Sequence, residues 1–308
     1  QMGKLSQRKN PSLWQRFVAY LRVLLGKILR FNILTGGQML LTGQHGLRGD
    51  FPTEASVCQA VVAEGIEAIA SALPFRIHGT MFKDLPLGEA PASNRFYELP
   101  VQPNMVLHVS SDWQNEADYL GAMSSKYRVR ARRARKKGDE LERREMGLDE
   151  ITLRQAEMFA FYVGIAEQSD FNIAILPPDY FTQWKAHFPE RFRVWGYFID
   201  GAFIGFSTTI ANGPELEAHF LGFDQSYNRS HQLYLNMLYD MAEDAIAADY
   251  QQLVYSRTAL EIKSSVGAVP EELKCWLHSR IRVADPLVPI VERFIAPLPE
   301  WVQRNPFK

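Results

Sequence analysis

The segment from Glu215 to Ala268 places the tightest limit on the fold, because its pattern changes between strand and helix in a fixed order. A period-two strand passes through a polar turn into an amphipathic helix, and a second strand then leads into a short charged helix. A strand that enters a helix through a polar turn gathers free backbone N–H groups at one place, and such places bind phosphates and oxyanions. The second strand brings Arg257 and Lys263 to the same end. The segment therefore predicts an α/β architecture with an anion site where the strands end.

Three antiparallel strands are predicted before this helix. Residues 192–199 and 203–211 alternate as half-buried strands do, and Asp200-Gly201 between them is a strong signal for a tight hairpin. A second turn, 212–214, leads into the third strand, 216–223. This order predicts a mixed, largely antiparallel sheet.

The remaining elements follow from periodicity and from helix-end signals. The predicted helices cover 12–30, 53–73, 113–122, 124–138, 148–168, a stretch from Pro178 that includes Trp184, 232–248 and 259–266. The other predicted strands cover 33–42, 75–81, 104–110, 253–256 and 275–283. Asp112 is the expected cap of the helix 113–122, and Ser124 or Ser125 that of the next helix. The proline-rich stretch 86–103 predicts a loop.

Charge is strongly segregated although the formal net charge is only -1. Residues 1–49 carry eight basic side chains and no acid, and residues 126–137 carry eight more and no acid. Like charges four residues apart, such as Arg128 and Arg132, destabilise a helix by roughly 0.2–0.5 kcal/mol per pair. Lys126, Arg128 and Arg132 are therefore predicted to bind an anion. RNA, CoA phosphates and anionic lipid are external candidates, and nearby Glu140, Glu142 and Glu145 offer an internal one.

The helix 12–30 has two interpretations. Its basic residues gather on one side and Trp14 lies among apolar residues, as in helices that rest in a membrane interface. The same pattern fits a helix that packs against the core or bridges two lobes. Its charges are too frequent for a membrane span.

Cysteine usage and missing motifs limit the reaction classes. Cys58 and Cys275 lie far apart and form no CxxC pair, so neither a disulfide framework nor a zinc site is expected. With no leader sequence recognised, a cytoplasmic location is predicted, and contact with a membrane surface through 12–30 stays open. No P-loop, GxGxxG, HExxH or GxSxG motif occurs, so metal catalysis and serine hydrolysis have no support.

The order of elements resembles that of the GNAT N-acyltransferase superfamily, and within it the uncharacterised Fem-type peptidoglycan-bridge acyltransferases. The resemblance rests on Phe220-Leu-Gly222-Phe-Asp224, on 233–239, on 255–268 and on the basic stretch from Ser124. It implies a mixed sheet flanked by helices and two GNAT-like lobes. The lobes would be 1–147, degenerate and including the basic helix, and 148–308, the acyltransferase lobe.

The resemblance also implies a reaction and its residues. An acyl or aminoacyl group would pass from acyl-CoA or aminoacyl-tRNA to an amine acceptor. Glu217 or His219 would take the amine proton and Tyr255 would protonate the leaving group. The donor would be bound by a set of polar residues at the turn and beyond the next strand: Asn228, Arg229, Ser230, His231, Gln232, Arg257 and Lys263. No metal is expected.

Several observations keep alternatives open. The turn 225–231 contains no glycine, whereas glycine lets a backbone approach a pyrophosphate closely, so the donor is undecided. Arg257 can instead pair with Glu261, with Lys263 in solvent. A catalytically degenerate GNAT-like protein that binds an anionic polymer or a membrane surface through its basic helices is the alternative function. An enzyme should have an open cleft between the third strand and 253–256.

Overall fold

The structure, a computed structural model, describes residues 32–43, 55–86, 96–99, 101–168, 175–280 and 301–307. The predicted helix 12–30 lies outside these residues, as do residues 281–283 of the last predicted strand.

A seven-stranded sheet forms the larger part of the fold, in the order β10-β4-β9-β8-β7-β6-β5. All neighbours in it pair antiparallel except β8 and β9, which are parallel. The predicted mixed, largely antiparallel sheet flanked by helices is therefore confirmed. The strands are β4 (Asn104–His108), β5 (Glu142–Glu145), β6 (Phe192–Ile199), β7 (Ala202–Asn212), β8 (Glu215–Phe223), β9 (Gln252–Ser256) and β10 (Val269–Glu271).

The β6–β7 hairpin forms as the sequence predicts. Asp200 and Gly201 both adopt left-handed backbone angles, with φ of 49° and 75°. Two left-handed residues in succession make the turn whose twist matches that of the flanking strands, and Asp-Gly is a favoured pair for it. Gly213 (φ 60°) supplies the same freedom between β7 and β8.

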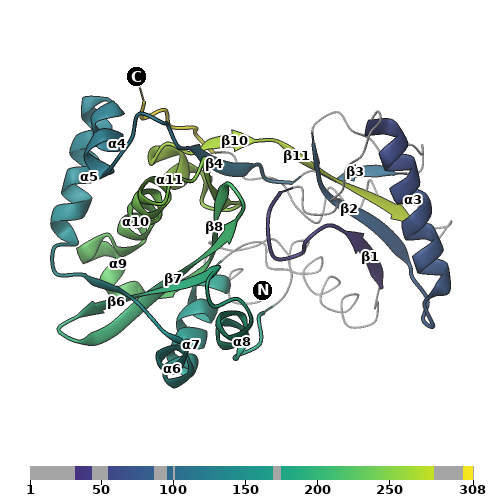
Figure 1. The fold of residues 1–308 in the computed structure, drawn as a ribbon, viewed down its shortest axis with the longest axis horizontal. Helices are drawn as coiled ribbons and strands as arrows, with labels where there is room; N and C mark the ends of the chain where they lie inside the picture. Colours follow the sequence, from purple (N-terminus) through teal and green to yellow (C-terminus); the bar gives the residue numbers. More distant parts are fainter. Residues whose placement is uncertain are drawn as a thin grey trace, which may run out of the picture.

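Helices cover both faces of the large sheet (Figure 1). One face carries α4 (Glu116–Ala122), α5 (Ser125–Lys137), α9 (Gln225–His231), α10 (Leu233–Ala247) and α11 (Leu260–Ser265). The other face carries α6 (Leu148–Leu153), α7 (Gln155–Ala166) and α8 (Tyr180–His187). The close packing of α7 on β8 requires Gly222, because a Cβ there would lie 2.5 Å from the backbone nitrogen of Tyr162.

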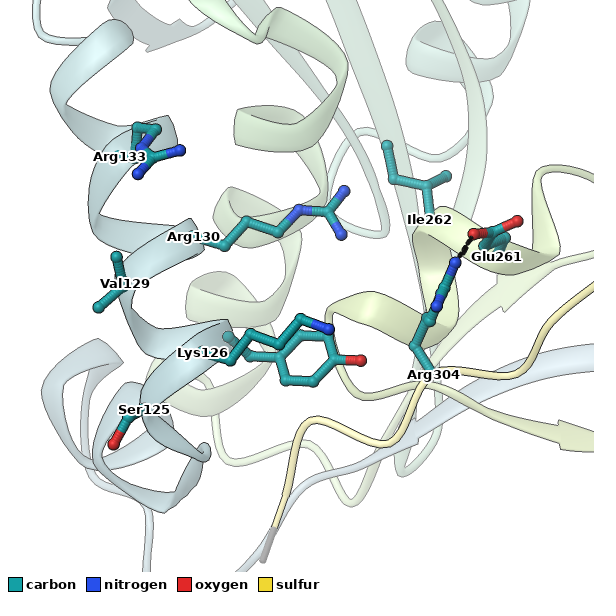
Figure 2. Close-up of a pocket in the computed structure, with 9 residues that line it drawn as sticks. Ser125, Lys126, Val129, Arg130, Arg133, Glu261, Ile262 and Arg304 are labelled. Atoms are coloured by element: carbon teal, nitrogen blue, oxygen red, sulfur yellow. Dashed lines mark hydrogen bonds and ion pairs between the residues drawn. The ribbon is translucent and has the colours of Figure 1, made fainter.

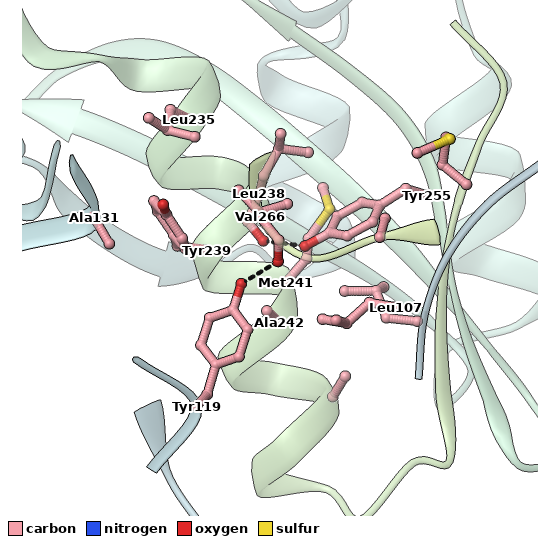
Figure 3. Close-up of a cluster of buried hydrophobic side chains, with 14 of the residues drawn as sticks. Leu107, Tyr119, Ala131, Leu235, Leu238, Tyr239, Met241, Ala242, Tyr255 and Val266 are labelled. Carbon is pink, nitrogen blue, oxygen red and sulfur yellow. Dashed lines mark hydrogen bonds between the residues drawn. The ribbon is translucent and has the colours of Figure 1, made fainter. Parts of the chain in front are cut away.

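The main core lies under α4, α5 and α10, and Figure 3 shows part of it. Its two most central tyrosines are almost fully buried, and each has a partner for its hydroxyl group. Tyr119 donates to the carbonyl of Val266, and Tyr255 donates to that of Leu238. Because a buried hydroxyl without a partner is costly, the first bond fixes α4 to the end of α11 and the second fixes β9 to α10.

A second sheet has four strands in the order β1-β2-β11-β3. They are β1 (Ile33–Gly36), β2 (Gly79–Pro86), β3 (Tyr97–Leu99) and β11 (Leu273–Ser279), with α3 (Ala55–Ala72) beside them. In Figure 1 this sheet lies next to the large one, and β10 of the large sheet leads directly into β11. Each sheet takes strands from both sides of residue 147, and the division into two domains at that residue stays a prediction.

Some element boundaries differ from the predicted ones. Asn115, not Asp112, caps α4, because its side chain accepts the N–H groups of Ala117 and Asp118. The predicted helix 148–168 is interrupted at Arg154, which separates α6 from α7. The strand predicted over 33–42 ends at Gly36, and the one predicted over 75–81 runs from Gly79 to Pro86. The strands β3, β5 and β10 were not predicted.

Candidate functional site

The parallel strands β8 and β9 separate near the middle of the large sheet. They pair only over Glu215–Glu217 and Gln252–Val254, although β8 continues to Phe223 and β9 to Ser256. Ligands of open α/β sheets bind in the crevice beyond the carboxyl ends of such strands. The point of separation is therefore the first candidate for a reaction centre.

Glu217 lies at this point. It is the last residue of β8 that pairs with β9, and it is 1% exposed. The side-chain amide of Asn212 donates to Oε1 of Glu217 at 2.6 Å. This bond comes from the other end of the β7–β8 turn and holds the carboxylate in place. The structure thus gives Glu217 the fixed position that a proton acceptor needs, in a closed environment.

His219 lies two residues further along β8 and packs among aromatic rings of α8 and the sheet. Its Nε2 is 2.7 Å from the hydroxyl of Tyr180, and its ring stacks on that of Tyr180 and lies near Trp184. Burial lowers the pKa of His219 to about 3. A histidine with this pKa is neutral near neutral pH and is a weak base, so His219 is a poor proton acceptor.

The buried His219 predicts acid sensitivity. Its pKa is about 3 in the folded protein and 6.5 as an ordinary histidine, so below pH 6.5 the unfolded chain binds the extra proton. Stability should therefore fall as the pH drops from 6.5 toward 3, by up to about 1.4 kcal/mol per pH unit. His219→Phe should flatten this slope in urea unfolding measured across that range. The exposed His187→Gln is the control, and equal slopes in wild type and His219→Phe would contradict the assignment.

Tyr255 and Lys263 hold the end of β9. The Tyr255 hydroxyl is committed to Leu238, and the Lys263 ammonium donates to the carbonyls of Tyr255 (2.7 Å) and Arg257 (2.7 Å), with Ser256 at 3.3 Å. Burial lowers the pKa of Lys263 to about 7. Ser256, Thr258 and Ala259 all have positive φ here, which is unusual for such residues. Lys263 therefore satisfies the carbonyls of a strained backbone segment, and it does not lie free in solvent.

Arg257 joins the two sheets. Its Nε donates to the carbonyl of Gln102 at 2.7 Å, and its guanidinium pairs with Asp84 on β2. The alternative pairing of Arg257 with Glu261 does not form, because Arg257 pairs with Asp84 and Glu261 pairs with Arg304. Arg257 and Lys263 thus do not converge on an open phosphate site, since both head groups are engaged inside the chain.

The predicted donor-binding turn is the short helix α9. Asp224 caps it, and Asn228 accepts the backbone N–H of Tyr234 in the first turn of α10. Gln232, at φ 49°, separates the two helices. Several polar groups of this turn join α9 to α10 and α5, and donor binding by the turn stays a prediction.

The remaining members of the predicted turn also have partners within the chain. Lys137 donates to the carbonyl of Arg229 at 3.5 Å, Ser230 lies 2.8 Å from Nδ1 of His231, and His231 Nε2 lies 3.4 Å from Glu140. Binding of a donor phosphate by the side chains of Asn228, Ser230 or His231 would therefore require these contacts to open. The bond from Lys137 engages only the backbone carbonyl of Arg229, which is an exposed residue.

A groove of about 880 Å³ lies between α5, α11 and the segment 301–307. Figure 2 shows Lys126 and Arg130 extending from α5 toward Glu261 on α11 and Arg304 on the C-terminal segment. Its lining comprises Ser125, Lys126, Tyr127, Val129, Arg130, Arg133, Glu261, Ile262 and Arg304. The volume is within the range of about 300–1,000 Å³ of small-molecule sites.

One row of basic residues on α5 lines the groove. Lys126, Arg130 and Arg133 are spaced i, i+4 and i+7 and share one face, whereas Arg128 and Arg132 do not line the groove. Lys126 was predicted; Arg130 and Arg133 were missed although their spacing from Lys126 was a usable signal. Arg304 had no such signal, because its position depends on a contact with a distant part of the chain.

Other charges of α5 are neutralised within the chain. Arg135 pairs with Glu116, Asp240 and Glu243; although burial alone would lower its pKa, Asp240 and Glu116 outweigh that effect and raise it. Glu140, Glu142 and Glu145, the predicted internal partners, pair instead with His231, Arg144 and Lys185.

The segment 301–307 forms one wall of the groove and is tightly anchored. The backbone N–H of Ser124 donates to Pro306 at 2.8 Å, and that of Arg304 donates to the Ser264 hydroxyl at 3.0 Å. Gly267 (φ 102°) packs directly against the Phe307 ring. A Cβ at this position would lie 2.4 Å from the ring, so glycine is required there. Arg304 is thereby held opposite α5.

Residues 125–264 match the family model of the acetyltransferase (GNAT) domain. This range contains α5, the separation of β8 and β9, and Lys263, and over these residues the predicted resemblance to the GNAT superfamily is confirmed.

Among solved structures, FemX matches with a TM-score of 0.55 and 11% identity, covering 84% of this chain and 82% of FemX. The C-terminal domain of a proposed lysylphosphatidylglycerol synthetase from Agrobacterium fabrum matches with a TM-score of 0.49 and 12% identity over 76% of this chain and 77% of that chain. A GCN5-related N-acetyltransferase from Kribbella flavida matches with a TM-score of 0.43 and 11% identity, covering 75% and 78%. At these identities, FemX shows a shared fold. No curated protein matches the sequence.

The described residues hold neither a metal-binding cluster nor a helix that could span a membrane. Within the ranges given above, no three histidine, cysteine or carboxylate residues are grouped so that they would hold a metal ion. In the same part of the chain, no helix combines the length and the apolar character needed to cross a membrane.

Proposed function

We propose that the protein is an N-acyltransferase that moves an acyl or aminoacyl group to an amine acceptor. The observation that carries the proposal is the separation of β8 and β9 at the buried Glu217 within the GNAT domain. A carboxylate where two parallel strands separate is suited to accept a proton from a bound amine.

The proposed reaction needs few groups from the protein. Glu217 takes a proton from the ammonium form of the acceptor, directly or through water, and the neutral amine attacks the donor carbonyl. The C–N bond forms and the bond to the leaving group breaks. The second proton of the attacking nitrogen passes to the leaving thiolate or ribose oxygen, and Glu217 releases the first proton to solvent. Asn212 orients Glu217 throughout. Tyr255 is not assigned to protonation of the leaving group, because its hydroxyl donates to Leu238 and burial raises its pKa.

The donor is either acyl-CoA, which GNAT domains generally use, or aminoacyl-tRNA. Both donors carry phosphate groups. Because polar side chains of the turn 228–232 already contact other parts of the chain, a phosphate-binding place elsewhere on the domain is favoured. The cytoplasmic location and the contact of 12–30 with a membrane surface remain predictions.

A second function is favoured by one observation. Glu217 is 1% exposed, and the Thr42 hydroxyl lies 2.6 Å from that of Ser256, which brings the segment 38–43 against the strand end. A closed centre of this kind fits a degenerate GNAT protein that binds an anionic polymer through α5. In an enzyme, the covering segment must move before the acceptor can enter.

Thermal shift and calorimetry with acetyl-CoA, a long-chain acyl-CoA, uncharged tRNA and aminoacyl-tRNA would test the proposal. A donor at 100 times its Kd should stabilise the protein by about 2.7 kcal/mol and raise Tm. Binding of one donor class, followed by acylation of an amine, supports the enzyme. Silence toward both acyl-CoAs and no acylation from aminoacyl-tRNA, together with salt-sensitive binding of tRNA irrespective of its aminoacyl group, would favour the binding protein instead.

A further inference from the structure

The groove between α5 and α11 has an uneven charge. Four of its lining residues are basic (Lys126, Arg130, Arg133 and Arg304) and Glu261 is its one acid. The three basic residues of α5 that line the groove span a separation of seven residues, a length of about 10 Å along the helix axis. Arg304 faces this row from the opposite wall (Figure 2).

Within the described part of the chain, the three basic residues of α5 that line the groove lack acidic partners. In the described part of the chain, no carboxylate lies within ion-pair distance of Lys126, Arg130 or Arg133. Their neighbour Arg135 has three such partners. Like charges four residues apart on a helix repel each other, so an anion in the groove would relieve a repulsion that the fold leaves in place.

The fourth basic residue, Arg304, is occupied by an internal carboxylate. Its Nε donates to Glu261 Oε1 at 3.1 Å, and a second, shorter bond joins the same two groups. Both side chains are accessible, with 37% and 51% exposed, so the pair is held only weakly. The backbone of Arg304 stays fixed through Ser264 whether or not the pair is formed.

Apolar surface completes the lining. Tyr127 and Ile262 are partly buried beside the basic residues, and the Lys126 ammonium lies 5.6 Å from the centre of the Tyr127 ring. A ligand that suits the groove therefore has phosphate charge for the basic row and an organic part, flat or apolar, for Tyr127 and Ile262.

We infer that this groove is a binding site for a phosphate ester and that Glu261 occupies Arg304 until the phosphate displaces it. The bound phosphate lies between the α5 row and Arg304, which pairs with it in a bidentate manner as arginine does. Glu261 then faces solvent. Because displacement requires the phosphate to compete with a carboxylate, the site favours ligands with two or more negative charges.

Calorimetry with inorganic pyrophosphate and the full chain at low ionic strength would test the site. Arg130→Gln combined with Arg133→Gln should weaken binding about tenfold or more, since bonds to charged groups are lost. The matched control is Arg128→Gln with Arg132→Gln, on the same helix but outside the groove, which should change affinity less than about twofold. An equal loss from both pairs would overturn a defined site in favour of general attraction by α5.

The role of Glu261 has its own measurement. Glu261→Gln should tighten pyrophosphate binding about three- to fivefold, because a competing negative charge is removed. When Glu261→Gln is introduced into the Arg304→Gln variant, the affinity for pyrophosphate should not rise. The two residues are then coupled in a double-mutant cycle. An unchanged affinity in Glu261→Gln would overturn the displacement.

Two natural sources of phosphate esters are then distinguished by competition. Displacement of pyrophosphate by coenzyme A supports a small-molecule ester, and displacement by uncharged tRNA supports a nucleic acid. If neither displaces it, the inferred ligand class is wrong and pyrophosphate binds as an adventitious ion only. These readouts do not involve acyl transfer, so the inference and the proposed function fail separately.

Discussion

Glu217→Gln is expected to lower kcat for amine acylation by about 10²- to 10⁴-fold, the usual contribution of a general base. Glutamine keeps the shape of the side chain and an oxygen that can accept the bond from Asn212, which lies at 2.6 Å. It cannot take a proton from the acceptor. The measurement is steady-state kinetics with whichever donor the protein binds, with KM determined separately.

Glu215→Gln is the matched control for this variant. It removes a carboxylate two residues earlier on β8, where the strand is still fully paired with β9. It should leave kcat within about twofold of wild type, as expected of a surface substitution. Full activity in Glu217→Gln, or an equal loss in both variants, would remove Glu217 from the proposed reaction.

Asp84→Ala should destabilise the protein by about 3–5 kcal/mol, the usual result of removing one partner from a buried ion pair. Asp84 is 1% exposed and pairs with both Lys83 and Arg257. Burial alone would raise its pKa, but Arg257 and Lys83 outweigh that effect and lower it. Without the carboxylate, two cations would remain at the junction of the sheets without an anion. Urea unfolding measures the loss.

Two further variants separate the causes. Asp84 has a φ of 64°, which asparagine adopts at a lower cost than alanine, so Asp84→Asn removes the charge with less backbone strain. Most of the loss should persist in Asp84→Asn. Glu98→Gln removes an exposed pair with Lys274 from the same sheet and should cost less than about 1 kcal/mol. A small effect of both Asp84 variants would show that the cluster contributes little.

The sequence predicts best where local signals decide the structure. Asp200-Gly201 and the period-two pattern around it identified the β6–β7 hairpin, and the apolar face of 232–248 identified α10. The strand β5 was missed because its residues, Glu-Arg-Arg-Glu, are all charged. They are accommodated because β5 is an edge strand, and Arg143 stacks over Trp195, 3.7 Å from its ring centre.

The candidate site was less predictable because its pairings are distant in the sequence. Arg257 meets Asp84, 173 residues away, and Lys263 folds back onto three carbonyls of its own loop. Neither contact has a local pattern. Two residues that the sequence singled out lie at the candidate sites. Glu217 lies where β8 and β9 separate, and Lys126 lines the groove.

The position of β11 in the small sheet has a consequence for synthesis of the protein. β11 pairs with β2 on one side and β3 on the other, so residues 273–279 supply an inner strand of a sheet whose other strands end at residue 99. During translation those earlier strands emerge long before it, with edges that have no partner, and such edges promote aggregation. The small sheet can close only after most of the chain has left the ribosome. A nascent chain of this protein should therefore depend on a chaperone until residue 279 emerges.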